Sequence, residues 1–229
     1  MANYFFIHIP KNGGMTIRRS DKLQIQIASK QTHKSELYSN MVVSTMNASG
    51  DHHGFEHARY RDIHEKYKMG DYKFFAVTRN PWARVASRFM FAKASIQLGK
   101  AHAPKDYCDV SSLDAFLEDR HNWGGKEYYW HRAIRGWYNA LDHVCDDNDI
   151  VMCDMLRLEH LNEDCEKYFG IPEMSGPRNV TAIKYNYKDL YNEKSIQIVA
   201  DWYKKDIEYW GYDFDTAATK NYWNTDASV

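Results

Sequence analysis

The chain has 229 residues, of which 44% are hydrophobic and 15% aromatic, and its formal net charge is -1. This length fits one domain with a sizeable core, and the apolar share excludes a disordered chain. A near-neutral charge gives no global attraction to nucleic acid or to an anionic membrane, so we expect neither as a partner. Any anionic ligand must then be held by a local basic patch.

The first predicted strand, residues 4–9, leads directly into a segment with a lysine and two adjacent glycines. Glycines let backbone N–H groups approach an anion closely, and a helix that begins near Gly14 would point its positive dipole end at the same place. Lys11 adds a full charge and Thr16 a hydroxyl. The segment has the features of a site for a phosphate-like anion, although an ordinary strand–turn–helix corner is the alternative. The residues expected to hold the anion are Lys11, Asn12, Gly13, Gly14, Met15 and Thr16.

The region between this segment and the next clear strand is less regular. Alternating apolar residues at 23–27 indicate a short strand, with a helix continuing from Gly14 as the alternative, and 42–45 reads as another strand. Histidines and acidic residues then gather at 51–57, before a helix expected over 56–68.

An aromatic and β-branched run predicts a buried strand over residues 72–78, and a helix follows over 81–98. Asn80 is a good N-cap, and Pro81 suits the first helical position. Arg79 therefore stands at the carboxyl end of a strand, just before a helix, which is where open α/β sheets bind ligands. Ser87 lies eight positions after Arg79.

The remaining predicted elements continue the alternation of strands and helices. They are helices at 112–121, 126–141, 160–169 and 193–210 and a strand at 150–157. Strands separated by helical stretches imply an α/β fold, a single domain with a central parallel β-sheet flanked by helices. We expect this domain to span residues 1–216, with residues 217–229 as a flexible C-terminal tail.

The two motifs together resemble those of a known enzyme family. The order Pro-Lys-x-Gly-Gly-x-Thr differs from the nucleoside triphosphate loop, in which the lysine follows the glycines. It resembles the P-loop-like 5′-phosphosulfate-binding loop of sulfotransferases that use 3′-phosphoadenosine 5′-phosphosulfate (PAPS), most of all the carbohydrate branch that includes the heparan 2-O-sulfotransferase type. The segment from Arg79 to Ser87 resembles the family's 3′-phosphate site, R-[ND]-P-x-x-R-x-x-S, at every fixed position. Segments 151–164, 179–181 and 203–214 look like the family's C-terminal half.

This resemblance implies the function and the roles of the site residues. The protein is expected to transfer a sulfuryl group from PAPS to a hydroxyl or amine of an acceptor, a carbohydrate or a small hydroxylated molecule, and to release 3′-phosphoadenosine 5′-phosphate. Lys11 would stabilise the leaving group, and Arg79 and Ser87 would bind the 3′-phosphate. Relatives carry a catalytic histidine or glutamate near the 51–57 cluster, so His57, then His53, then Glu56 are the candidates for general base.

Other functions remain open from the sequence. A kinase on a related fold would use ATP, although the G-K-[ST] order is absent, and a non-catalytic nucleotide-binding protein would lack the transfer step. The histidine cluster could also bind a metal in a hydrolase, since His53 and His57 are four residues apart, but H-E-x-x-H is absent and we expect no metal. The acceptor and the oligomeric state are not specified by any motif.

Sequence features also bear on the compartment. No apolar run approaches the length of a membrane span, and no signal-peptide pattern precedes the first strand, so we expect a cytoplasmic protein. The four cysteines form no C-x-x-C pair and are expected to be reduced. They are Cys108, Cys145, Cys153 and Cys165.

Overall fold

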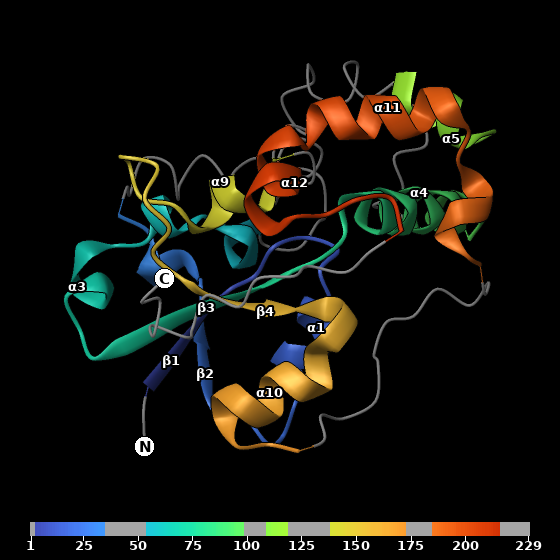
Figure 1. Ribbon diagram of the computed structural model, residues 1–229. Coiled ribbons are helices and arrows are strands. Elements are labelled where there is room, and N and C mark those ends of the chain that lie inside the picture. Colours follow the sequence, from blue (N-terminus) through green and yellow to red (C-terminus); the bar gives the residue numbers. More distant parts are fainter. Residues whose placement is uncertain (1–2, 35–53, 99–108, 119–137, 173–184, 216–229) are drawn as a thin grey trace.

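The computed structural model in Figure 1 shows an α/β fold built on a parallel sheet. It describes residues 3–34, 54–98, 109–118, 138–172 and 185–215. In this part of the chain the sheet has four strands in the order β2-β1-β3-β4, and every neighbouring pair is parallel. The strands are β1 (Asn3–Ile7), β2 (Ile25–Ile27), β3 (Tyr72–Thr78) and β4 (Asp154–Arg157).

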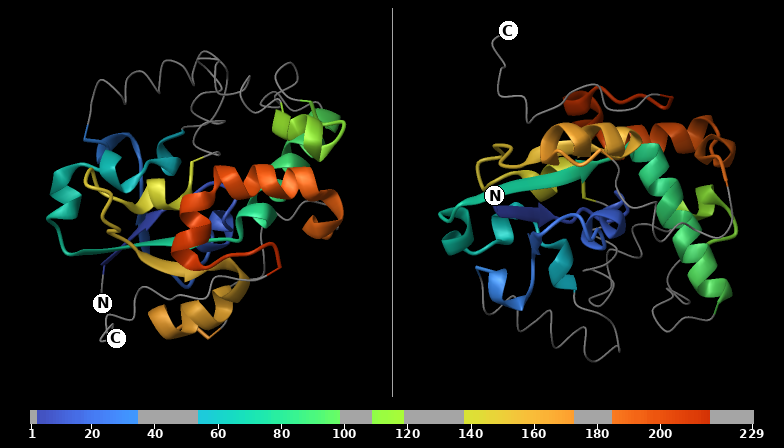
Figure 2. Two further views of the ribbon diagram at one scale, coloured as in Figure 1. Left: turned by 45° about the horizontal axis from the view of Figure 1, so that its top comes forward. Right: turned by 90° about the horizontal axis from the view of Figure 1, so that it is seen from below.

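Helices cover both faces of the sheet (Figures 1 and 2). Helices α1 (Gly14–Arg18) and α10 (Leu161–Phe169) lie on one face. The other face carries five further helices of the described part of the chain, of which α11 packs on α4 and α5. These helices are α4 (Pro81–Gln97), α5 (Leu113–Glu118), α9 (Ala140–Val144), α11 (Glu193–Trp202) and α12 (Lys204–Trp210). A short helix, α3 (Glu65–Lys68), precedes β3.

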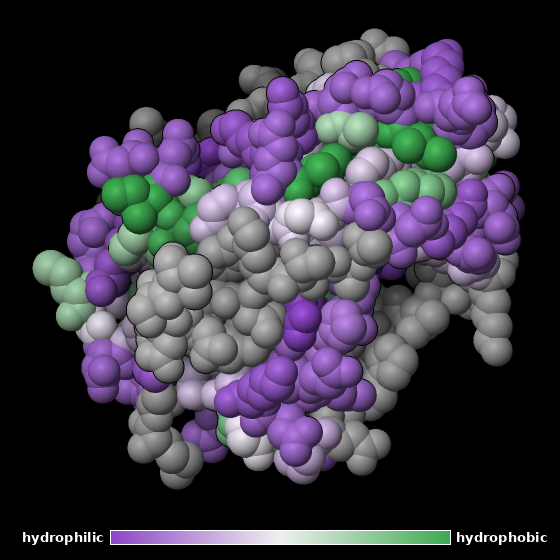
Figure 3. All heavy atoms as spheres, viewed as in Figure 1, coloured by the Kyte–Doolittle hydropathy of each residue, from purple (hydrophilic) through white to green (hydrophobic). Residues whose placement is uncertain are grey.

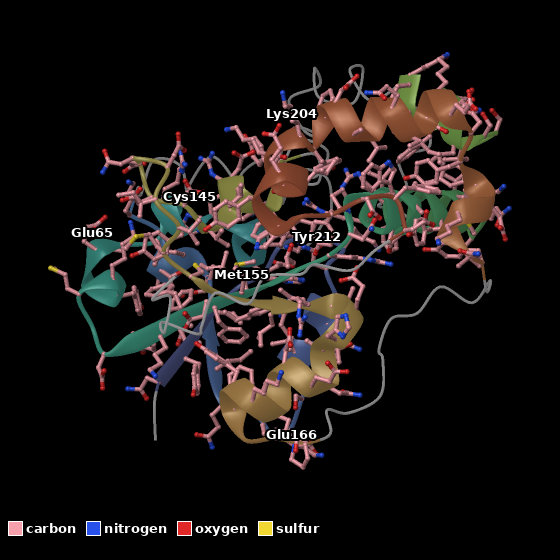
Figure 4. All side chains as sticks on the ribbon, viewed as in Figure 1. Glu65, Cys145, Met155, Glu166, Lys204 and Tyr212 are labelled. Carbon is pink, nitrogen blue, oxygen red and sulfur yellow. The ribbon has the colours of Figure 1, made fainter. Side chains whose placement is uncertain are left out.

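Strand alternation explains why there are two apolar cores. Phe5 pairs with Phe74 and faces the α4 side, while the next pair, Phe6 and Phe75, faces α1 and α10. Successive side chains of a strand point to opposite faces, so a strand covered on both sides must be apolar throughout. In Figure 4, Met155 and Tyr212 lie between the layers, whereas Glu166 and Lys204 point outward from α10 and α12.

Several sequence predictions are confirmed. The strand at 72–78 has the predicted bounds, and α4 ends one residue before the predicted 98. The alternating segment at 23–27 contains strand β2, so the alternative of a helix continuing from Gly14 is wrong. The predicted strand at 42–45 and the tail at 217–229 lie outside the described residues.

Other boundaries were wrong, for reasons of long-range pairing. The helix expected over 56–68 is replaced by short 3₁₀ turns and α3, because the backbone of Asp62 and His64 bonds instead to residues 32–34. The strand expected from 150 begins at Asp154, because Val151 bridges to Cys145. The first strand ends at Ile7 rather than residue 9.

Two predicted helices also differ. The helix expected over 193–210 is interrupted at Tyr203, where φ is -104°, and forms α11 and α12. The described end of the helix expected over 126–141 is not helical before Ala140, where α9 begins.

Among the described residues on the face drawn in Figure 3, most exposed side chains are hydrophilic, with apolar side chains between them. Among the described residues, no helix is both long enough and apolar enough to cross a membrane. The described cysteines, Cys145, Cys153 and Cys165, are buried free thiols, and burial raises the pKa of each.

Candidate active site

The strand order places a topological switch point at the carboxyl ends of β1 and β3. The chain leaves β1 toward β2 on one side and returns to β3 on the other, so β1 and β3 flank the switch point of the sheet. Ligands of open α/β sheets bind at such points. The loop after β1 (residues 8–13) and the corner between β3 and α4 (residues 79–80) both lie at this edge.

Three consecutive residues of the loop are tied to β3 and α4. Arg84 Nε donates to the carbonyl of Pro10 at 3.2 Å, and Arg79 Nη1 donates to that of Lys11 at 3.0 Å. The buried Asn12 side chain donates from Nδ2 to the carbonyl of Val77 at 2.8 Å. These hydrogen bonds join two segments that are more than sixty residues apart in the sequence.

The loop has an unusual backbone. Lys11 has φ of 67° and Gly13 has φ of 73°, both left-handed. For a lysine this conformation costs about 1–2 kcal/mol, and such strain concentrates at ligand-binding sites. A Cβ on Gly13 would lie 2.4 Å from Leu158 Cδ1, so the Leu158 side chain would have to shift to admit one.

Gly14 begins α1 and is pressed against a buried histidine. A Cβ at this position would lie 2.0 Å from His8 Cδ2 and Nε2, so only glycine lets the His8 ring pack there. The first N–H groups of a helix lack intrahelical acceptors, which leaves Gly14 and Met15 able to donate to a ligand. Thr16 is buried and its N–H bonds to the Gly13 carbonyl at 2.9 Å.

Lys11 lies among cations. Burial lowers the pKa of its ammonium to about 7, and the charges of Arg79 and Arg88 act in the same direction. Its Nζ stands 4.3 Å above the ring centre of Phe91, a contact that favours the charged form. Cations held together in this way would be stabilised by a bound anion.

The β3–α4 corner matches its sequence prediction. The Asn80 side chain accepts from the N–H groups of Trp82 and Ala83, and Pro81 occupies the first helical position. The Asn80 N–H donates to Glu159 Oε1 at 2.7 Å. Burial lowers the pKa of Arg79, which still stays charged at neutral pH.

The structure places Ser87 on α4, half-buried, two turns beyond this corner. Within the described residues no hydrogen bond joins Ser87 to the loop or to Arg79. The structure therefore brings Lys11 and Arg79 together directly, whereas Ser87 shares only the helix that follows Arg79.

His57 lies beside the loop. Its Nδ1 is 2.9 Å from the carbonyl of His8, and the two rings are 4.4 Å apart. A carbonyl only accepts, so Nδ1 carries the hydrogen and the lone pair of the neutral ring is on Nε2, as a general base requires. Glu56, in contrast, points toward Arg18 at 3.8 Å.

His53 lies outside the described residues. Within residues 3–34, 54–98, 109–118, 138–172 and 185–215, no group of three or more metal-ligating side chains comes together.

Three contributors to the site were missed from the sequence: His8, Arg84 and Phe91. Arg84 stands in the R-N-P-x-x-R motif, but helical spacing does not show that an arginine will be only 2% exposed. His8 lies within an apolar run and reads as a strand residue. Phe91 projects from α4 and has no local signal that marks a contact with Lys11.

Comparison of the chain with protein-family models, with curated proteins and with solved structures finds no match. The geometry and the motifs therefore carry the functional argument.

Proposed function

We propose that this protein is a sulfotransferase that uses PAPS. The observation that carries the proposal is the hydrogen bond of Arg79 to the Lys11 carbonyl at the switch point of the sheet. It joins the two segments that resemble the family's 5′-phosphosulfate and 3′-phosphate sites. A ligand with anionic groups on both sides of one ribose needs these two segments close together.

The residues at this edge fit such a ligand chemically. The donors are a lysine, an arginine and backbone N–H groups, all of which complement phosphate and sulfate oxygens. Burial, and after it the charges of Arg79 and Arg88, lowers the pKa of Lys11, and a polyanionic ligand would supply an opposite charge beside it. Lys11, Asn12, Gly13, Gly14, Met15 and Thr16 would hold the 5′-phosphosulfate, and Arg79 and Ser87 the 3′-phosphate.

When bound, PAPS supplies the sulfuryl group, whose bond to the bridging phosphate oxygen breaks as its bond to the acceptor oxygen forms. The chain's part is positioning and charge stabilisation, as in phosphoryl transfer. Lys11 donates to the oxygen on which negative charge grows. His57 takes the proton of an acceptor hydroxyl on Nε2, while its Nδ1–H stays on the His8 carbonyl.

The test is calorimetric titration with 3′-phosphoadenosine 5′-phosphate, beside adenosine 5′-phosphate and ATP. We expect micromolar binding that depends on the 3′-phosphate, followed by transfer of label from PAPS in a screen of carbohydrates and small hydroxylated acceptors. A preference for ATP would indicate a kinase, and binding without transfer to any acceptor would favour a non-catalytic nucleotide-binding protein. An absence of binding would refute the proposal.

A further inference from the structure

Arg84 joins the loop after β1 to the opposite layer of the fold. The side chain comes from the first turn of α4 and is almost entirely buried. Its Nε donates to the Pro10 carbonyl at 3.2 Å, and its Nη1 donates to the Tyr138 carbonyl at 2.8 Å. One guanidinium thus holds two backbone segments that have no strand or helix in common.

The far side of this guanidinium is anchored by Asp206 of α12. Asp206 Oδ2 lies 4.0 Å from Arg84 Nη1, and both side chains are nearly inaccessible. The same carboxylate accepts from the N–H groups of Ala140 and Leu141, at 2.6 and 3.0 Å, where α9 begins. The ring of Tyr203 lies 5.4 Å from the guanidinium carbon. Arg84 is therefore held on this side by Asp206 and Tyr203, and Asp206 is itself bonded to the start of α9.

The point of contact on the loop matters because the next residue is Lys11. The peptide whose carbonyl Arg84 holds is the Pro10–Lys11 peptide, and its orientation sets φ of Lys11, which is 67°. A left-handed lysine persists only when its surroundings hold it there. Arg79 holds the carbonyl on the other side of the same residue.

We infer that Arg84 is a positioning residue, which fixes the Lys11 backbone from the α9–α12 side and thereby aims the Lys11 ammonium into the anion site. Two nitrogens of Arg84 are already bonded to the carbonyls of Pro10 and Tyr138, so the effect of Arg84 on the site is exerted through the loop. A lysine at position 84 would retain the charge near Asp206 but not the planar fork that reaches two carbonyls at once.

The first test is independent of any ligand: amide hydrogen exchange of the peptide covering residues 8–18 in the free protein. Arg84→Lys is expected to speed exchange there about tenfold, the loss of one charge-assisted hydrogen bond. The matched control is Arg59→Lys. Arg59 lies over the ring of Tyr138 and pairs with Asp62, but it has no bond to the loop. Exchange of this peptide should be unchanged in the control, and equal rates in wild type and Arg84→Lys would overturn the inference.

Where Arg84→Lys does not fold, the double variant Arg84→Met/Asp206→Asn replaces it. It removes both buried charges and keeps an oxygen that can cap α9, and replacing a buried ion pair in this way is often tolerated. Its partner control is Asp206→Asn alone, which keeps the bond to Pro10. The inference is supported if residues 8–18 exchange faster in the double variant than in Asp206→Asn. Equal exchange in the two variants contradicts it.

The second test rests on the proposed function. Its outcomes distinguish a failure of the positioning role of Arg84 from a failure of the sulfotransferase proposal. If wild type binds 3′-phosphoadenosine 5′-phosphate, Arg84→Lys should lower kcat at least tenfold with a smaller change in KM for PAPS, and should lower it no further in a Lys11→Ala background. An undiminished kcat, or full additivity with Lys11→Ala, would remove the positioning role. A wild type that does not bind the nucleotide would refute the sulfotransferase, while the exchange experiment would still decide the role of Arg84.

Discussion

Lys11 is the residue on which charge, backbone strain and position in the fold converge. Its ammonium lies over Phe91, its carbonyl is bonded to Arg79, and its φ is left-handed. Burial and two nearby arginines bring the pKa of a group that is normally protonated until pH 10 down to about 7. Near neutral pH this lysine can therefore change its protonation state when an anion arrives.

This gives a pH-dependent prediction for binding. Lys11 in the free protein is mostly neutral at pH 8, and a bound anion raises its pKa. Binding of 3′-phosphoadenosine 5′-phosphate should therefore take up close to one proton at pH 8, where the phosphates of the nucleotide are already ionised. Calorimetry in buffers of different ionisation enthalpy measures this uptake. In Lys11→Met the uptake at pH 8 should vanish. Equal uptake by wild type and Lys11→Met would show that another group titrates.

His57 carries the second prediction at the scale of single residues. If His57 is the general base of the proposed transfer, His57→Ala should slow sulfuryl transfer by roughly a hundredfold or more. Nucleotide affinity should be unchanged, because in that role the ring would contact the acceptor and not the phosphates. Turnover with labelled PAPS measures the rate of transfer, and calorimetry measures the nucleotide affinity. The control is His64→Ala, since His64 caps α3 through Lys66 N–H and should leave transfer unchanged. A larger loss from His53→Ala than from His57→Ala would exchange their roles.

At the scale of elements, the start of α1 depends on how closely Gly14 packs against the His8 ring. Gly14→Ala would push a methyl group into the His8 ring, and we expect it to lower the free energy of unfolding by about 1–3 kcal/mol. His8→Ala in the same chain should recover part of that loss, as chemical denaturation would show. Gly170→Ala is the control, because it suffers left-handed strain with nothing within 4 Å, and His8→Ala should not rescue it. A fully stable Gly14→Ala would contradict the packing argument.

The β3–α4 corner supplies a prediction about binding. Arg79→Ala should weaken binding of 3′-phosphoadenosine 5′-phosphate by about 2–3 kcal/mol, the usual size of a charged hydrogen bond, in calorimetry. Arg157 ends the neighbouring strand β4 but pairs with the buried Asp164 at 2.6 Å. Arg157→Ala should therefore reduce stability more than affinity. If Arg79→Ala binds as wild type does, the 3′-phosphate assignment is wrong.

At the scale of the whole molecule, the sheet carries a separate apolar core on each face. Phe75 belongs to the core under α1 and α10, is fully buried, and has ring neighbours in Phe6 and Phe169 at 5.0 and 5.1 Å. This second core contains the packing that holds α1 against the sheet. Removing side chains from this second core should therefore lower the free energy of unfolding of the whole molecule more than it changes the rate of the proposed transfer.

Phe75→Ala is expected to reduce the free energy of unfolding by about 3–5 kcal/mol in chemical denaturation. The same substitution at Phe91, which is 38% exposed, should cost less than about 1 kcal/mol. If Phe75→Ala lowers the free energy of unfolding as little as Phe91→Ala does, the core on the α1 face contributes little to stability.

The elements that sequence reasoning located well are those whose signals are local. Asn80 and Pro81 mark the start of α4 within two residues, and a continuous apolar run marks β3, because capping and burial on both faces act over a few neighbouring positions. The helix expected over 56–68 failed because residues 62–64 gain more by pairing with residues 32–34 than by bonding among themselves. No local pattern carries that information.

The candidate site divides in the same way. The residue types and spacing of the loop at 11–16 and of the segment at 79–87 lead to the prediction of two anion-binding segments. That prediction is local, since it uses only the chemistry of a glycine pair, a lysine and a strand-end arginine. Only the folded sheet brings Arg79 to the Lys11 carbonyl, buries Arg84 between Pro10 and Asp206, and sets His57 on the His8 carbonyl. The physical reason is that these contacts join residues tens of positions apart, so they depend on strand order and packing of whole layers rather than on the preferences of any one segment.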